Sequence, residues 1–298
     1  VFVEIKARFD EAANLEWGEK LERAGVRVHY SFPGVKVHSK LALIRRMEHG
    51  KPRLYSYLGT GNFHEETAQI YSDFGIFTAD PRLTSEVSSV FAFLENIKPP
   101  KKDFEHLLVG KFNLRPALDE LIDYEIAAAK QNEPAHFILK TNSLEDKAII
   151  KKLYEASQAG VKIQLIIRGI CCLVPGVPGL SENIEVISIV DRYLEHSRVF
   201  IFHHGGEERM LMSSADLMQR NLSFRIETAF PIYDPELQQE VRELIQLQLE
   251  DNVKARIIDQ EQKNEYRRGA SDIPVRSQIE TYYYFKRKTD LPSVSQSG

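Results

Sequence analysis

The chain has 298 residues, of which 43% are hydrophobic, 28% charged and 10% aromatic. This composition is that of a globular protein, and it excludes a disordered chain, a collagen-like repeat and a disulfide-rich scaffold. The net charge is −4, so we expect no general nucleic-acid binding through a basic face, and the length favours two domains.

The first segments in chain order predict an α/β unit. The run Val1–Ala7 resembles the inside of a strand and has no Met at its start, so we expect a fragment of a longer protein. Apolar residues then recur at helical spacing over residues 11–24, and Gly25 is a typical helix stop. Residues 26–30 alternate as a strand does.

A Pro- and Lys-rich stretch at residues 98–102 predicts a linker, which divides the chain into domains at residues 1–101 and 102–298. The second domain is expected to open with an amphipathic helix over residues 112–133 and to end in further helices and a tail. Its other expected elements are a helix at 147–159, a strand at 161–167, a helix at 235–250 and a frayed tail after about residue 268.

Within this order the chain repeats itself. The helix, glycine and strand of the first unit return in the second. His38 and Lys40 open a strand-like run that returns with His196 and Arg198. At a strand's period of two, each histidine shares one face with the cation that follows it.

The repeat continues in register downstream. The run Gly59–Asn62 is followed by Asp73 eleven residues after its end, and Ser213–Asp216 is followed by Glu227 at the same distance. An Asp-Pro pair comes seven residues later in both copies. Because these motifs return in one order at one spacing, we infer two copies of a single α/β unit rather than a solenoid.

Two histidines and two cations brought into one site suit a phosphate. Lys40 and Arg198, with the amide of Asn62, can surround phosphate oxygens while one imidazole attacks phosphorus. The other imidazole can protonate the leaving oxygen. We therefore predict His38 and His196 as catalytic residues, and Lys40, Asn62 and Arg198 as substrate-binding residues.

A nucleophilic histidine must be neutral and held in one tautomer. A carboxylate on its far nitrogen fixes that tautomer and stabilises the charge that develops on attack. Asp73 and Glu227 occupy matching positions, so we predict them as the catalytic carboxylates that orient His38 and His196. Arg168 ends a predicted apolar strand, where a cation indicates an anionic ligand.

The two cysteines, Cys171 and Cys172, are adjacent and would point to opposite faces of a strand, so we expect neither a disulfide nor a metal pair. This cysteine usage favours a cytoplasmic protein. No segment is apolar enough to span a bilayer, and no signal peptide is recognised. Peripheral association with the inner membrane would have to come from other parts of a longer protein.

The duplicated motifs resemble those of a known superfamily. His38 and Lys40 with Asn62, and His196 and Arg198 with Asp216, are similar to degenerate copies of the HxK…N/D signature of the phospholipase D superfamily. More closely, residues 1 to about 270 resemble the C-terminal half of bacterial polyphosphate kinases of the first type. The segments that carry this resemblance are Ala7–Asn14, Pro33–Lys40, Gly59–Phe63 and Asp191–His196.

The resemblance implies two similar phospholipase D-like α/β domains, each a mixed sheet flanked by helices, with the active site at their interface. It implies an ATP–polyphosphate phosphotransferase that works reversibly through a phosphohistidine, with Mg²⁺ as cofactor. Its partners would be ATP or ADP and inorganic polyphosphate, in a homo-oligomer of the full-length protein. Family members also have amino-terminal and head domains, so we expect this fragment's nucleotide site to be incomplete.

Five residues take expected roles from the resemblance. His38 would be the phosphorylated histidine, and His196 its partner near the transferred phosphate and the general acid. Tyr71 would stack on adenine, and Arg168 would bind phosphate. Arg8 corresponds to an arginine of the Mg²⁺ site, and because a guanidinium has no lone pair for a metal, we expect it to act through phosphate oxygens.

Two other functions fit the same motifs. A phospholipase D-like phosphodiesterase or nuclease would use the same histidines on a diester, although the flanking segments favour the kinase. A non-catalytic polyanion-binding domain would explain Arg198 in place of the signature lysine. For the kinase we expect a basic tunnel with the candidate liners Arg192, Arg198, Arg220, Arg225, Lys140 and Lys147.

Overall fold

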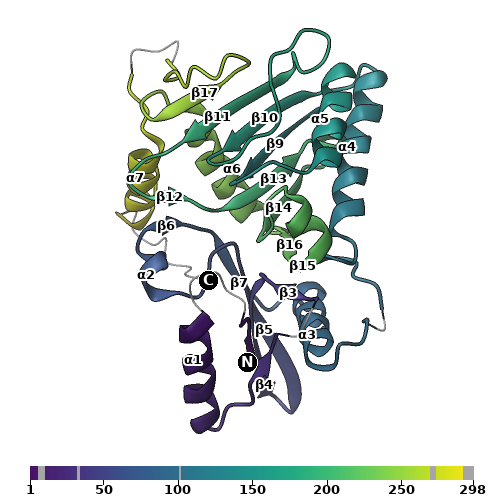
Figure 1. Ribbon diagram of the computed structural model, residues 1–298, viewed down its shortest axis with the longest axis vertical. Coiled ribbons are helices and arrows are strands. Elements are labelled where there is room, and N and C mark those ends of the chain that lie inside the picture. The colour runs from purple at the N-terminus through teal and green to yellow at the C-terminus, as the bar shows by residue number, and fades with distance from the viewer. Residues whose placement is uncertain (6–10, 32–33, 101, 269–272, 291–298) are drawn as a thin grey trace, which may run out of the picture.

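The computed structural model describes residues 1–5, 11–31, 34–100, 102–268 and 273–290. We call residues 1–100 the first half and the remainder the second half, which form the lower and upper parts of Figure 1. The elements of the first half are β1 (Phe2–Val3), α1 (Glu11–Arg23), β2 (His29–Tyr30), β3 (Lys36–Val37), β4 (Lys40–Glu48), β5 (Lys51–Gly59), α2 (Glu65–Ala68), β6 (Tyr71–Ser72), β7 (Gly75–Thr78) and α3 (Pro81–Asn96).

The second half contains the larger share of the regular structure. Its strands are β8 (Leu108–Val109), β9 (His136–Thr141), β10 (Lys162–Ile167), β11 (Ile184–Ile189), β12 (Leu194–Glu195), β13 (Arg198–Phe202), β14 (Arg209–Ser213), β15 (Arg225–Ile226), β16 (Thr228–Pro231) and β17 (Ala255–Ile258). Its helices are α4 (Leu114–Lys130), α5 (Lys147–Gln158), α6 (Pro235–Glu250) and α7 (Ser277–Asp290), with short helical turns at His204–Gly206 and Arg220–Phe224.

An eight-stranded mixed sheet dominates the second half. Its strand order is β17-β11-β10-β9-β13-β14-β16-β8, in which β11, β10 and β9 are parallel and the other pairs antiparallel. In the described part of the first half, β4, β5 and β7 form an antiparallel sheet, and β1 pairs with β2 in parallel.

Alternation along β13 shows how the large sheet separates two cores. Phe200 and Phe202 point into a core with the buried faces of α4 and α5. Val199 and Ile201 point into the opposite core, which α6 covers. That second core also contains Leu58 of β5 and apolar residues of α3, so the two halves share one hydrophobic interior.

The duplicated sequence produces duplicated helix ends. Asp80 and Asp234 cap α3 and α6 by accepting backbone N–H groups, and each is followed by a proline at the first helical position. Gly25 and Gly160 take positive φ angles of 82° and 99° after α1 and α5, a conformation that favours glycine.

Two short parallel bridges connect the halves. β3 of the first half pairs with β15 of the second, and β12 of the second half pairs with β6 of the first. Figure 1 shows both bridges at the junction of the two parts. Each strand that precedes a predicted catalytic histidine therefore lies against the opposite half.

Most expected elements are confirmed, since α1, α4, α5, β10 and α6 lie where helical or strand periodicity predicts them. The strand expected at 26–30 is reduced to β2, and the tail after residue 268 contains α7, which local periodicity did not predict. None of the described helices combines the length and apolar character that a membrane span requires.

Candidate active site

The two predicted catalytic histidines occupy equivalent links between strands. His38 lies between β3 and β4, and His196 lies between β12 and β13. The expectation that each histidine shares a strand with its cation is wrong, because both strands begin at the cation. Lys40 Nζ donates to the carbonyl of His38, and Arg198 Nη1 donates to that of His196 at 2.7 Å, so each cation folds back on its histidine.

Each histidine is paired with the carboxylate of the other half. His38 Nδ1 lies 2.9 Å from Glu227 Oε2, and His196 Nδ1 lies 2.9 Å from both carboxylate oxygens of Asp73. The sequence order, which sets Asp73 beside His38 and Glu227 beside His196, is therefore not the pairing in the structure. The interdomain bridges β3–β15 and β12–β6 cause this exchange, because they align each histidine with the strand that leads to the opposite acid.

Two hydroxyl groups support these carboxylates, and the sequence analysis missed both. Thr60 Oγ1 donates to Asp73 Oδ1 at 2.6 Å, and Ser214 Oγ donates to Glu227 Oε2 at 2.5 Å. Each hydroxyl also accepts the backbone N–H that follows its carboxylate. Thr60 and Ser214 hold the same position in the repeated motif, so a residue-by-residue comparison of the two copies could have found them.

The environment keeps both imidazoles neutral. Burial is the largest influence on His38 and His196, and it lowers the pKa of each against the opposing pull of its carboxylate. Burial alone would raise the pKa of Asp73 and Glu227, but the interactions with the histidines outweigh it and lower both. With Nδ1–H donating to an ionised carboxylate, His38 Nε2 carries the lone pair that a nucleophile needs, whereas Nε2 of His196 lies 3.2 Å from Arg198 Nη1.

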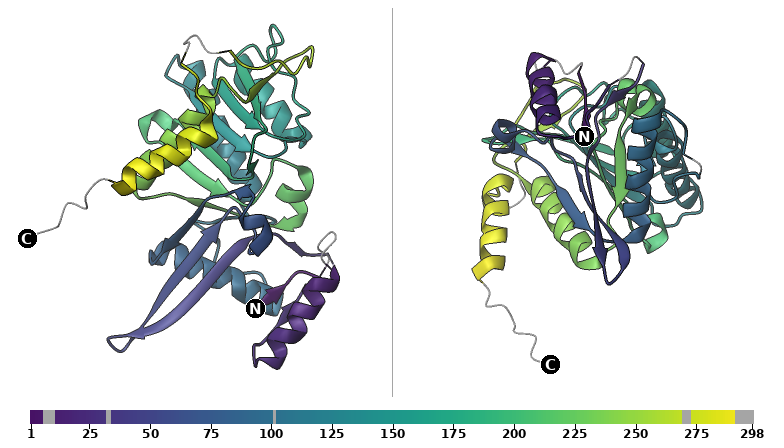
Figure 2. Two further views of the ribbon diagram at one scale, coloured as in Figure 1. Left: turned by 90° about the vertical axis from the view of Figure 1, so that its left-hand side faces the viewer. Right: turned by 90° about the horizontal axis from the view of Figure 1, so that it is seen from below.

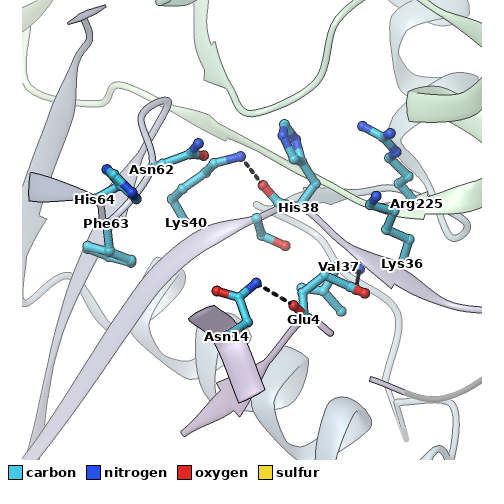
Figure 3. A pocket seen from close by; sticks show the side chains of 11 residues that line it. Glu4, Asn14, Lys36, Val37, His38, Lys40, Asn62, Phe63, His64 and Arg225 are labelled. Atoms are coloured by element: carbon cyan, nitrogen blue, oxygen red, sulfur yellow. Dashed lines mark hydrogen bonds between the residues drawn. The ribbon is translucent and has the colours of Figure 1, made fainter. Parts of the chain in front are cut away.

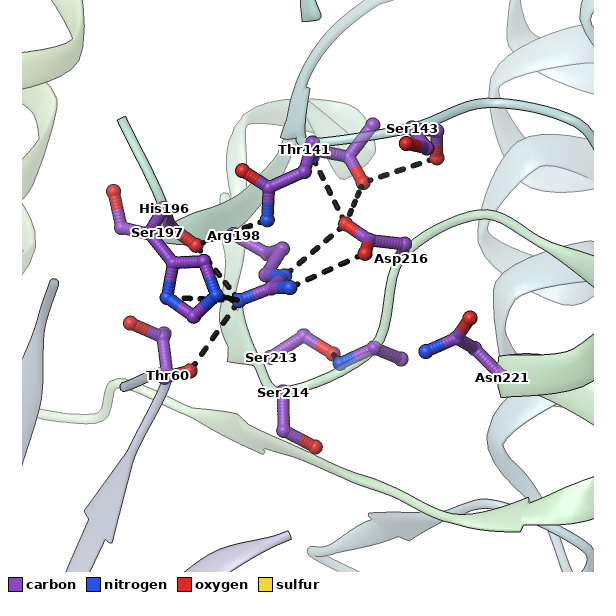
Figure 4. A network of polar contacts seen from close by, with 12 residues as sticks. Thr60, Thr141, Ser143, His196, Ser197, Arg198, Ser213, Ser214, Asp216 and Asn221 are labelled. Carbon is purple, nitrogen blue, oxygen red and sulfur yellow. Dashed lines mark hydrogen bonds and ion pairs between the residues drawn. The ribbon is translucent and has the colours of Figure 1, made fainter. Parts of the chain in front are cut away.

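The two cations of the repeat differ in their counter-charges. Arg198 forms a two-pronged pair with Asp216, whose oxygens lie 3.1 and 3.2 Å from Nε and Nη2 (Figure 4). Burial acts to raise the pKa of Asp216, but Arg198 and other donors lower it to about 2. Among the described residues Lys40 has no ion-pair partner, and burial lowers its pKa to about 7.

Arg168, the predicted phosphate-binding residue, is held by neutral oxygens. Its Nε donates to the carbonyl of Glu195 at 2.7 Å, and Nε and Nη2 contact Asn142 Oδ1 at 3.2 and 3.0 Å. No carboxylate of the described residues lies within ion-pair distance of this guanidinium, so its charge remains available to an anion. No sequence signal pointed to Asn142, which also donates to the carbonyl of His196.

A cleft of about 430 Å³ opens in front of His38. Figure 3 shows Lys40, Asn62 and His64 on one side of the histidine, and Lys36 and Arg225 on the other. Basic and amide side chains therefore flank the imidazole, and Glu4 also lines the cleft. The His38 side chain is 26% accessible compared with 11% for His196. This distribution of donors suits an anion placed against His38.

The other predicted residues are placed as follows. The Tyr71 ring lies 4.9 Å from the His196 ring, whereas Arg8 falls outside the described residues. Of the expected tunnel liners, Arg225 borders the cleft, and Arg192, Arg220 and Lys147 are exposed. The prediction of Lys140 as a tunnel liner is wrong, because its side chain is buried in an ion pair of 2.7 Å with Glu195. Arg198 is likewise buried, in an ion pair with Asp216.

The described residues do not themselves form a metal site. They contain no group of three His, Cys, Asp or Glu side chains that could hold an ion. Asp73 and Glu227 are each engaged by a histidine and a hydroxyl, so the oxygen ligands that Mg²⁺ prefers are already committed here.

Comparisons with known proteins agree on one family. Residues 1–100 match the polyphosphate kinase C-terminal domain 1, and residues 107–278 match the polyphosphate kinase C-terminal domain 2. The chain is 50% identical to the polyphosphate kinase of Vibrio parahaemolyticus and 48% identical to that of Escherichia coli, over 96% of this chain and 41% of each relative. It thus spans less than half the length of these relatives.

Solved structures support the fold. The polyphosphate kinase of Porphyromonas gingivalis superposes with a TM-score of 0.89 at 46% identity, over 97% of this chain and 44% of that one. The phosphatidylserine synthase of Haemophilus influenzae reaches a TM-score of 0.59 at 11% identity, over 97% of this chain and 81% of that one, and shows the fold alone. The expected phospholipase D-like α/β fold is confirmed, and the chain belongs to the polyphosphate kinase family as part of its C-terminal region.

Proposed function

We propose that this chain is the catalytic region of a polyphosphate kinase, which transfers the γ-phosphoryl group of ATP reversibly to polyphosphate through a phosphohistidine on His38. One observation carries the proposal. A neutral His38, backed by the fully buried Glu227, faces a cleft rich in basic side chains. Members of the family to which the chain belongs are named for this activity.

The geometry supports His38 rather than His196 as the nucleophile. Arg198 is held in an ion pair by Asp216, while Lys40 feels Glu227 only at longer range and forms no ion pair among the described residues. Lys40 and Arg225 border the cleft at His38, so this side favours an anion. His38 is also the more accessible imidazole.

The proposed step forms one bond and breaks one. The lone pair of His38 Nε2 attacks the γ-phosphorus, and the bond from that phosphorus to the bridging oxygen breaks as ADP leaves. Glu227 stabilises the positive charge on His38, and Lys40 and Arg168 hold the equatorial oxygens. For this step His196 acts in its protonated form, which its pair with Asp73 stabilises; it donates the Nε2 proton to the leaving oxygen, and the neutral imidazole takes a proton back from the terminal phosphate that later attacks phosphohistidine.

Several finer assignments belong to this proposal. Tyr71 stacks on adenine, Asn62 donates its amide to phosphate, and Arg8 holds phosphate oxygens. Mg²⁺ would enter bound to the nucleotide phosphates, where it neutralises charge, since the described residues supply no ligand cluster. Assembly into a homo-oligomer and attachment to the inner membrane would depend on the full-length protein.

The test uses the full-length protein with ATP labelled at the γ or the α phosphate. We expect acid-labile, alkali-stable label from the γ position only, which chases into acid-insoluble polymer. The label should be absent in His38→Ala and form far more slowly in His196→Ala. The exposed His49, in the turn between β4 and β5, gives a matched control whose His49→Ala variant should label normally. Turnover of a phosphodiester without γ label would instead support the phosphodiesterase or nuclease.

A further inference from the structure

The segment that carries His196 is held from outside by the start of the C-terminal helix. Gln278 of α7 binds Tyr193 on both backbone groups: its Oε1 accepts the N–H at 2.9 Å, and its Nε2 donates to the carbonyl at 2.8 Å. Two residues earlier, Arg276 forms a two-pronged pair with Asp191, at 2.5 and 2.8 Å. The side chains of Arg276 and Gln278 therefore hold residues 191–193, just before β12, in place.

Gln278 also reaches a charged network behind His196. Its Nε2 donates to Glu195 Oε1 at 2.8 Å, while Glu195 Oε2 accepts from Lys140 Nζ at 2.7 Å. Lys140 in turn donates to Ser197 Oγ at 2.7 Å. The residues on both sides of His196 are thus fixed by one network, in which the buried Glu195 and Lys140 compensate each other.

We call Arg276 and Gln278 the clasp. The start of α7, which carries the clasp, is itself anchored to α6. Asp251, at the end of α6, accepts from the backbone N–H and the hydroxyl of Ser277, both at 2.7 Å. Figure 2 shows α7 lying alongside α6, and Lys288 pairs with Glu240 farther along the two helices. These contacts fix the position of α7 along α6, and so they fix Gln278 beside β12, next to which Figure 1 shows α7.

We propose that Gln278 is a positioning residue for the phosphoryl-transfer reaction, which acts by holding Tyr193 and Glu195 so that His196 faces the transferred phosphate. This inference rests on the proposed role of His196 and adds to it a dependence on the C-terminal helix. Gln278 is not among the residues that line the cleft in front of His38. Its effect must therefore pass through His196, and this requirement makes the proposal testable.

A double-mutant cycle in the full-length protein provides the test. The measured quantity is the rate at which His38 acquires label from γ-labelled ATP. Gln278→Ala should reduce this rate about tenfold in the wild-type background, and less than twofold in the His196→Ala background. Lys288→Ala, which loosens the same helix away from His196, is the matched control and should leave the rate unchanged.

The pH profile of the labelling rate gives an independent readout. The groups that face His196 are Asp73, Arg198, Lys40 and the Tyr71 ring. Because burial is the main cause of the lowered pKa of His196, and because a general acid must carry its proton, freeing the segment should move the alkaline limb of the profile to higher pH in Gln278→Ala. A loss of folded enzyme alone would lower the rate without moving that limb.

The outcomes separate the two proposals. Equal rate losses in both backgrounds, with an unmoved limb, would show that Gln278 only stabilises the fold and would overturn its positioning role. Absence of γ label from wild-type protein would overturn the phosphohistidine mechanism itself. A loss confined to the wild-type background supports the clasp.

Discussion

At the scale of single residues, the fully buried carboxylate of Glu227 sets the state of His38. In Glu227→Gln an amide replaces the carboxylate, so the Nδ1–H tautomer is no longer favoured and the charge formed on attack is not stabilised. We expect kcat to fall by about a hundredfold or more in a polyphosphate synthesis assay.

The matched control for this variant is Glu125→Gln. Glu125 of α4 is equally buried and accepts two backbone N–H groups, but neither His38 nor His196 is among its partners. Its replacement should lower the melting temperature without lowering kcat. Comparable losses of kcat in both variants would contradict the orienting role of Glu227.

The neutral histidines also predict how stability depends on pH. Burial lowers the pKa of His38, His136, His196 and His204, so below about pH 6.5 the unfolded chain binds more protons than the folded one. The free energy of unfolding should therefore fall as the pH drops from 7.5 to 5.5. Urea unfolding at both pH values measures this slope.

His38→Gln removes one of these groups and should make the slope shallower. The same change at the exposed His49 should leave the slope as it is in the wild type. An unchanged slope in His38→Gln would mean that the neutral state of this imidazole is not linked to folding.

At the scale of elements, a glycine fixes how closely β15 approaches the link after β8. A Cβ at Gly110 would lie 2.3 Å from the carbonyl oxygen of Arg225, and Gly110 N–H donates to the carbonyl of Glu227 at 2.8 Å. Gly110→Ala should displace the strand that presents Glu227 to His38, at a cost of about 1–3 kcal/mol. We expect kcat to fall with it in the synthesis assay.

Gly179→Ala is the control variant for Gly110→Ala. Gly179 has a positive φ of 73°, and a Cβ at this position would meet no atom of the described residues within 4 Å, so its replacement strains only a surface turn. The Gly179→Ala variant should lose some stability and keep its kcat. Equal kcat values in the two variants would show that the approach of β15 does not govern the site.

Local signals in the sequence predicted the duplicated elements well. Helical periodicity and the glycine stops act over a few residues of chain and predicted α1, α5 and α6, whereas α3 was not predicted, although Asp80 and Pro81 at its start repeat as Asp234 and Pro235 before α6. The repeat pointed to the two histidines, their cations and their carboxylates, whereas Arg168 came from the end of a predicted strand and Thr60, Ser214 and Asn142 were missed. The exchange of carboxylates was not predictable, because it depends on two-residue strands that pair across more than a hundred residues of sequence.

At the scale of the whole molecule, the shared core predicts joint unfolding. Leu58 lies in β5 of the first half and is fully buried among residues of both halves. Leu58→Ala should cost about 3 kcal/mol and lower a single calorimetric transition rather than release one half. Leu153→Ala, in the core that only the second half forms, should shift the same transition. Two separate transitions in either variant would contradict a common interior.

The exchanged pairs also bear on how such a chain could arise. Each histidine lies against the acid of the other copy, as it would in a symmetric dimer in which every subunit lends its carboxylate to its neighbour. Gene duplication and fusion would turn that dimer into one chain without altering its chemistry. The two copies differ in one pair of residues, Lys40 and Asn62 in the first and Arg198 and Asp216 in the second; under the proposed function, this difference would give His38 an anion site and leave His196 to move protons.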